Sequence, residues 1–163
     1  MSLCAHKYEK NKYFDPHRNV WAIKLKPGEF HVCKSNDEEI LVTTLGSCIS
    51  ACIRDKELGV GGMNHFMLPQ SEDGEWAGAS SSTRYGNYAM EHMINEIYKK
   101  GGKKSNLEVS IFGGAAMFAA GSSTRVGDSN IEFVKGYLAI EGFKVHQEDV
   151  GGRMARKVHF NPR

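Results

Sequence analysis

Cys48 and His65 are the two residues of this chain whose types and spacing most clearly indicate chemistry. Each lies in an apolar run, and the two runs follow one another along the chain. A thiol is mostly protonated at neutral pH, whereas the thiolate is the nucleophile. A neighbouring imidazole accepts the thiol proton, holds the thiolate as its imidazolium, and later returns a proton to the leaving group. The pair therefore predicts a nucleophilic cysteine with a histidine base.

A β-hairpin would bring these two side chains together. Residues 55–58 are polar and precede Gly59, so we expect them to form the loop, with Arg54 opposite Gly59. Counting back in antiparallel register then pairs Cys48 with His65. Directly opposite residues have Cβ atoms about 4.5–5.5 Å apart and point to one face. A slip of one residue would turn the two side chains to opposite faces, so the prediction depends on the register.

A cysteine–histidine pair needs a third group that fixes the tautomer and orientation of the imidazole. Thr43 and Thr44 precede a Gly46-Ser47 turn, and either hydroxyl fits this role because the turn can reset the alternation of the strand. The small Gly46 and Ser47 also let a substrate carbonyl approach the main chain. Backbone N–H groups around Cys48 would then stabilise an oxyanion.

The cysteines Cys4, Cys33, Cys48 and Cys52 also have structural interpretations. Cysteine is among the residue types most often buried, and we expect Cys52 to be a core residue. Cys48 and Cys52 would share a strand face about 13 Å apart by strand rise, which is too far for one zinc ion. The Gly-Gly-Ala run at 113–115 lacks the lysine of a phosphate loop. We therefore expect no metal and no other cofactor.

The composition is that of a single globular domain. The 163 residues are 40% apolar and 25% charged, which are ordinary values for a soluble protein. The net charge of +2 is small and is not gathered in one block, which argues against a nucleic-acid-binding protein. No apolar run approaches the length of a membrane span, and no apolar signal segment follows Met1. We expect a cytoplasmic protein with reduced thiols.

Strands dominate the expected secondary structure. Residues 1–20 are polar and are expected to be a loosely ordered arm, and residues 21–163 to be one domain. Helical spacing of apolar residues predicts a helix over 85–100, and a capping box at 129–132 predicts the start of a second. Alternation and β-branched residues predict strands over 21–25, 30–33, 39–45, 48–53, 60–68, 107–112, 143–150 and 157–160. This set of elements predicts an α+β or layered α/β domain.

Six short motifs resemble, in order, those of the chemoreceptor glutamine deamidase (CheD) family, and they cover about residues 21 to 160. The motifs are Thr43-Thr44-Leu45-Gly46-Ser47-Cys48, Asn64-His65-Phe66-Met67-Leu68-Pro69, Tyr85-Gly86-Asn87-Tyr88-Ala89-Met90, Phe112-Gly113-Gly114-Ala115, Val126-Gly127 with Asn130, and Asp149-x-Gly151-Gly152 with Arg153 and Arg156. One of them alone would carry little information. Six in order that include the surroundings of the nucleophile form a specific match.

The resemblance implies a layered sandwich of mostly antiparallel sheet with two main helices, a fold shared with bacterial toxin deamidases. It implies hydrolysis of glutamine side-chain amides on methyl-accepting chemotaxis receptors, and in some members hydrolysis of receptor methyl esters. Cys48 is then the nucleophile, His65 the base, and Thr43 the favoured orienting residue, with Thr44 as its rival. The implied partners are the receptors and a CheC-type chemotaxis phosphatase.

Two alternative functions remain open from the residues alone. Transglutaminase-like acyl transfer would use the same thioester, with an amine in place of water. A non-enzymatic module that binds a chemotaxis phosphatase would not need Cys48, so Cys48→Ala would leave its phenotype intact. A deamidase would lose its activity with the same substitution.

Overall fold

The computed structural model of the chain describes residues 11–69, 79–117 and 123–163. None of the helices in these ranges is long and apolar enough to cross a membrane. The strands are β1 (Lys12–Asp15), β2 (Val20–Lys24), β3 (Phe30–Cys33), β4 (Ile40–Leu45), β5 (Ile49–Asp55), β6 (Val60–Asn64), β7 (Leu107–Gly113), β8 (Val145–Val150) and β9 (Arg156–Phe160). The helices are α2 (Ala79–Lys99), the short 3-10 helix η2 (Lys104–Asn106) and α3 (Ser123–Ile140).

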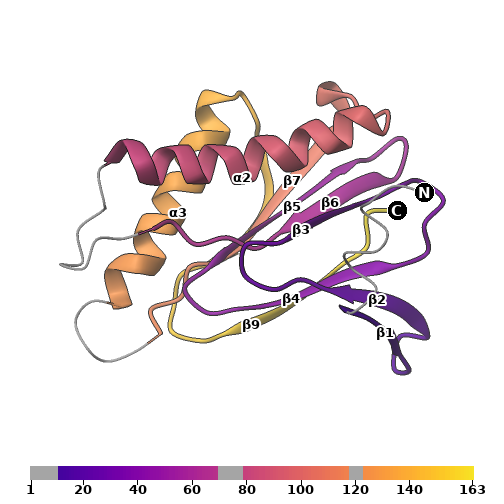
Figure 1. Cartoon of the computed structure of the whole chain (residues 1–163), viewed down its shortest axis with the longest axis horizontal. Helices are drawn as coiled ribbons and strands as arrows, with labels where there is room; N and C mark the ends of the chain where they lie inside the picture. The colour runs from indigo at the N-terminus through magenta and orange to yellow at the C-terminus, as the bar shows by residue number, and fades with distance from the viewer. Residues whose placement is uncertain (1–10, 70–78, 118–122) are drawn as a thin grey trace.

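The strands form two sheets (Figure 1). The four-stranded sheet has the order β1-β2-β4-β9, and the five-stranded sheet has the order β3-β6-β5-β7-β8. Neighbouring strands are antiparallel except in the pairs β2–β4 and β7–β8, which are parallel. Two mainly antiparallel sheets with two long helices confirm the predicted α+β sandwich.

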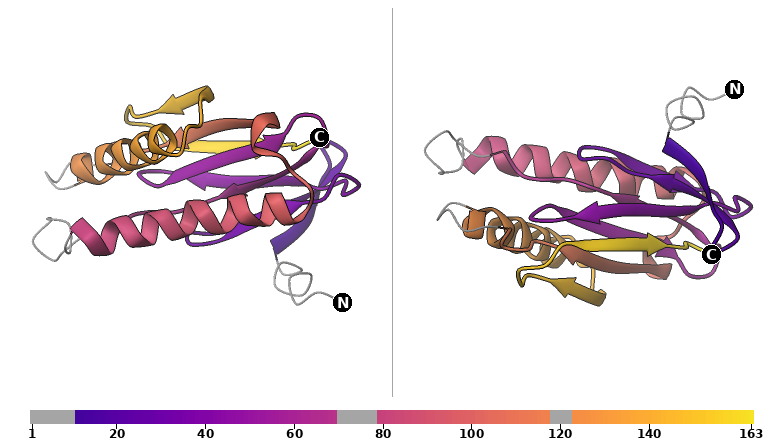
Figure 2. Two further views of the ribbon diagram at one scale, coloured as in Figure 1. Left: turned by 90° about the horizontal axis from the view of Figure 1, so that it is seen from above. Right: turned by 90° about the horizontal axis from the view of Figure 1, so that it is seen from below.

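The sheets and helices are stacked in three layers. Helices α2 and α3 run side by side and contact strands of the five-stranded sheet (Figure 2). Met93 of α2 and Val134 of α3 pack there with Ile53 in the larger hydrophobic core. The opposite face of the five-stranded sheet meets the four-stranded sheet, and Leu41 and Met63 belong to the core between the two sheets. Both faces of the central strands β5 and β6 are therefore covered, which explains why nearly all of their residues are buried.

Each predicted strand is present, with ends that differ by a few residues, whereas the starts of both helices differ from the prediction. Helix α2 begins at Ala79, before the predicted start at residue 85. Helix α3 begins at Ser123, so Ser129 and Glu132 lie inside it and the predicted capping box is wrong. A serine followed three residues later by a glutamate occurs both at the start of a helix and inside one. Local sequence therefore does not separate the two cases.

Ordered structure begins earlier than the expected arm at 1–20 implies. Residues 1–10 lie outside the described residues, but β1 pairs with β2 as an antiparallel hairpin. Asp15 ends β1, and its carboxylate accepts the backbone N–H groups of His17 and Arg18 at 2.9 and 3.2 Å. Such side-chain bonds to a nearby backbone stabilise tight turns. The polar composition of this segment therefore reflects a turn and an edge strand.

The β5–β6 hairpin fixes how the strands that lead to Cys48 and His65 are aligned. Asp55 pairs with Val60, so the loop is 56–59 and not 55–58 as predicted. The Asp55 carboxylate is buried and accepts N–H groups of the loop, among them that of Leu58 at 3.0 Å. Gly59 has a φ of 72°, a conformation that favours glycine and closes the loop.

Candidate active site

The turn at 46–48 lies at one end of the sandwich (Figure 1). It joins β4 of the four-stranded sheet to β5 of the five-stranded sheet, so the chain crosses between the two layers here. The N-terminal ends of α2 and α3 lie at the same end of the molecule. Cys48 directly precedes β5 and is half-buried, so its thiol is neither sealed in the core nor fully exposed.

The predicted pairing of Cys48 with His65 is wrong by two residues. Ile49 and Phe66 exchange two backbone hydrogen bonds of 2.9 Å, so that Ser50 lies opposite His65. The cause is the hairpin loop, which is displaced by one residue at each side. A shift by an even number keeps the face, so Cys48 and His65 remain on one face as diagonal neighbours, for which Cα separations of about 7–8 Å are typical.

Thr43, and not Thr44, contacts His65. The Thr43 hydroxyl donates to the Leu25 carbonyl at 2.8 Å, so its single proton is used. Its oxygen therefore accepts from Nδ1 of His65, at 2.7 Å. Thr43 is fully buried and His65 is 4% exposed, whereas Thr44 is exposed on the other face of β4. This arrangement places the imidazole proton on Nδ1 and the lone pair on Nε2.

The Nε2 atom of His65 is buried and has no hydrogen-bond partner among the described residues. A buried acceptor left without a donor is costly, and its lone pair is free to take a proton from a neighbouring group. Alternation from the Ile49–Phe66 bridge puts Cys48 on the same face, but its thiol makes no hydrogen bond to the ring in this structure. Catalytic hydrogen bonds are often long before substrate binds, and tighten in the complex.

Burial makes the uncharged forms of both groups the resting forms. Burial raises the pKa of the Cys48 thiol above its usual value of 9.0. Burial lowers the pKa of His65 below its usual value of 6.5, and the Glu29 carboxylate opposes part of this change. At neutral pH both directions favour a thiol and a neutral imidazole.

The carbonyl oxygens on either side of Ser47 are fixed by the end of β7. The N–H of Gly114 donates to the Cys48 carbonyl at 2.8 Å, and that of Ala115 donates to the Gly46 carbonyl at 2.9 Å. Gly113 has a φ of 108°, and a Cβ there would collide with the Cys48 carbonyl. The Gly-Gly-Ala run thus allows two backbone segments to approach closely. Its sequence alone did not reveal this role.

Two backbone N–H groups of the turn are left available. The N–H of Ile49 is paired with Phe66, but those of Ser47 and Cys48 donate to no atom of the described residues. Unpaired N–H groups beside a nucleophile are the donors from which oxyanion holes are built. Whether these N–H groups stabilise an oxyanion, as expected around Gly46 and Ser47, stays a prediction.

Asn130 contacts this turn and was not singled out by the sequence as a site residue. It is fully buried in α3, donates from Nδ2 to the Ser47 carbonyl at 2.8 Å, and accepts the N–H of Leu68 at Oδ1, at 3.1 Å. The available sequence signal is the place of Asn130 one helical turn before the core residue Val134. This spacing predicts a buried amide, and a buried amide needs hydrogen-bond partners.

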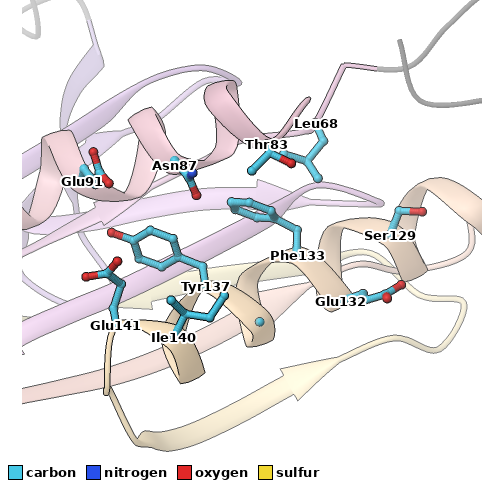
Figure 3. Close-up of a pocket in the computed structure, with 11 residues that line it drawn as sticks. Leu68, Thr83, Asn87, Glu91, Ser129, Glu132, Phe133, Tyr137, Ile140 and Glu141 are labelled. Atoms are coloured by element: carbon cyan, nitrogen blue, oxygen red, sulfur yellow. The ribbon is translucent and has the colours of Figure 1, made fainter. Parts of the chain in front are cut away.

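Neither Cys48 nor His65 lines the groove in Figure 3. It has a volume of about 600 Å³ between α2 and α3, and Phe133 and Tyr137 of α3 line it opposite Asn87 and Glu91 of α2. A smaller cavity of about 170 Å³ is lined by His65 together with residues of α2. Within the described part of the chain, no three His, Cys, Asp or Glu side chains are grouped so that they could hold a metal ion.

Comparisons with known proteins identify the relatives of this chain. Residues 67–163 match the family model described as CheD chemotactic sensory transduction. A protein of Hahella chejuensis named "Probable chemoreceptor glutamine deamidase CheD" is 51% identical over 153 residues, which cover 93% of this chain and 71% of that protein. Proteins of the same name from Halorhodospira halophila and Burkholderia vietnamiensis are 49% and 46% identical, over 93% and 94% of this chain and 70% and 61% of their own lengths. This chain belongs to the CheD family.

Proposed function

We propose that this chain hydrolyses the side-chain amides of glutamine residues on chemoreceptors, with Cys48 as nucleophile and His65 as base. The observation that carries the proposal is the hydrogen bond of Thr43 to Nδ1 of His65, since it directs the Nε2 lone pair toward base chemistry on the face that Cys48 shares. The names of the relatives supply the substrate, a chemoreceptor glutamine.

The reaction begins with attack by sulfur on the carboxamide carbon. The Cys48 thiol gives its proton to Nε2 of His65 as the C–S bond forms, and the carbonyl becomes an oxyanion held by the N–H groups of Ser47 and Cys48. When the intermediate collapses, the C–N bond breaks and the departing nitrogen takes the proton from His65. Ammonia leaves, and the glutamyl group remains as a thioester on Cys48.

Water then completes the reaction. His65 takes a proton from water as the oxygen attacks the thioester carbon, and collapse of the second intermediate breaks the C–S bond. The sulfur recovers a proton from His65, and a glutamate side chain is released. A glutamyl methyl ester would form the same thioester with methanol as the leaving group, so the proposal includes receptor methyl esters.

Peptide mass spectrometry of a chemoreceptor cytoplasmic fragment incubated with the protein tests this function. Each converted glutamine should gain about 1 Da, and about 3 Da in water enriched in ¹⁸O, because one oxygen of the new carboxylate comes from solvent. Transglutaminase-like transfer would instead attach an added primary amine in preference to ¹⁸O. A receptor fragment whose glutamines all keep their masses would contradict the proposal.

Thr43→Val should lower kcat/KM by about 10- to 100-fold, because the valine removes the acceptor that holds the His65 ring and its tautomer. The matched variant Thr44→Val removes an exposed hydroxyl from the same strand and should change kcat/KM by less than about twofold. Nitrogen NMR of the imidazole should show an Nδ1–H tautomer in the native protein and its loss in Thr43→Val. Equal effects of the two substitutions would show that Thr43 does not orient His65.

The acid limb of the pH profile should lie below pH 6.5. His65 must be neutral to accept the thiol proton, and burial lowers its pKa from the usual 6.5. As pH falls, kcat/KM should therefore stay constant down to this lower pKa. It should then decline as the imidazole becomes protonated. Measuring kcat/KM between about pH 5 and 9 checks this. A midpoint above 6.5 would contradict a lowered pKa of His65.

A further inference from the structure

We infer that Asn130 is a positioning residue that aims the backbone N–H of Cys48 at the oxyanion. This inference rests on the proposed function. Asn130 is fully buried in α3 and spans the two segments that carry the proposed nucleophile and base. Its amide binds the Ser47 carbonyl at 2.8 Å and the Leu68 N–H at 3.1 Å.

The geometry of the peptide bond connects this amide to the reaction. The carbonyl of Ser47 and the N–H of Cys48 belong to one planar trans peptide, so the two groups point in opposite directions. When Asn130 holds the oxygen on the α3 side, the N–H of Cys48 is directed away from α3. That N–H donates to no described residue, so its direction is set through the carbonyl that Asn130 binds.

The neighbouring peptides show why this contact is needed. The carbonyls of Gly46 and Cys48 are both fixed by backbone N–H groups at the end of β7. The Ser47 carbonyl lies between them and accepts from the side chain of Asn130, its one partner among the described residues. Without this amide, the peptide that carries the N–H of Cys48 could rotate between two fixed neighbours.

Close packing of α3 on the turn makes the contact rigid. Gly127 lies one helical turn before Asn130 on the same face. A Cβ at Gly127 would collide with the carbonyls of Gly114 and Ala115. The helix backbone therefore rests directly on the segment that holds the turn. Asn130 also ties Leu68 to the same helix, so the segment that follows His65 and the segment that precedes Cys48 share one support.

The test compares two reactions of Cys48 in Asn130→Ala. Deamidation forms an oxyanion, whereas alkylation by iodoacetamide needs the thiolate but forms none. For a chemoreceptor fragment, we expect kcat to fall by about 10- to 100-fold with KM within about threefold. The rate of Cys48 alkylation, followed by mass spectrometry of its peptide, should stay within about twofold.

Val134→Ala is the matched control, because Val134 is a fully buried core residue of α3 with no polar group to bind the Ser47 carbonyl. It should lose stability but keep kcat. Asn130→Asp keeps the side-chain size and the acceptor for Leu68 but loses the donor to Ser47, so its kcat should also fall, and it decides the question if Asn130→Ala does not fold.

An unchanged kcat in the Asn130 variants would overturn the inference, as would equal losses of kcat and of alkylation, which would mean that Asn130 acts through the thiol. Both outcomes leave the proposed function intact as long as the native protein converts glutamine and Cys48→Ala does not. Absence of conversion by the native protein would instead reject the function itself.

Discussion

Cys48→Ala is expected to abolish conversion of receptor glutamine, with kcat/KM reduced by about 10⁵-fold or more. The thioester cannot form without the sulfur, and water alone attacks an amide far more slowly. Peptide mass spectrometry should then show no gain in mass at any glutamine that the native protein converts. The substitution removes one half-buried sulfur at the start of β5, so the melting temperature should change little.

Cys52→Ala is the control for this result. Cys52 lies on the same strand, is buried in the core between the sheets, and burial raises the pKa of its thiol to about 12. This variant should lose about 1 kcal/mol of stability and keep full activity. If Cys48→Ala converts glutamine as fast as the native protein, the thiol is not the nucleophile. If the native protein converts none but still binds a chemotaxis phosphatase, the binding-module alternative gains support.

His65→Gln should have the second-largest effect, a loss of about 10²- to 10⁴-fold in kcat/KM. Glutamine can keep a polar contact to Thr43, but it cannot take a proton from the thiol or return one to ammonia. The alkylation of Cys48 by iodoacetamide at pH 7 should also slow, because the thiol loses its base and burial keeps its pKa above 9.0. Raising the pH should restore alkylation in this variant, while deamidation should stay low because the acid function is also lost.

His159→Gln is the matched control for the histidine. Its Nε2 atom is likewise buried without a partner among the described residues, and burial lowers its pKa, but it pairs with Val42 in β9 away from the turn. The two variants should therefore differ in catalysis and resemble each other in stability. Equal activity of His65→Gln and the native protein would refute the role of His65.

Local sequence patterns predicted the strands better than their alignment. Alternation and β-branched residues mark the strands, because one or both faces of each are buried. The register of β5 and β6 depends on Asp55, whose carboxylate holds the loop by hydrogen bonds that composition does not reveal. The predicted pairing of Cys48 with His65 was off by an even number of residues, so the face expected for the two side chains did not change.

The choice between Thr43 and Thr44 needed tertiary structure. Both are β-branched and adjacent, and the decision rests on which face of β4 meets the five-stranded sheet. Asn130 was missed for a related reason. Its partners are 62 and 83 residues away in sequence, so no local pattern could connect them. Resemblance to the family placed it in a motif but gave it no role.

The proposed orienting bond joins the two sheets: Thr43 belongs to the four-stranded sheet, and His65 follows a strand of the five-stranded sheet. The position of the imidazole therefore depends on how the layers sit on one another, and this is set by the core that contains Leu41 and Met63. A substitution in that core would shift a catalytic angle as well as lose buried contacts. If the proposed function holds, we expect substitutions in that core to lower turnover before they prevent folding.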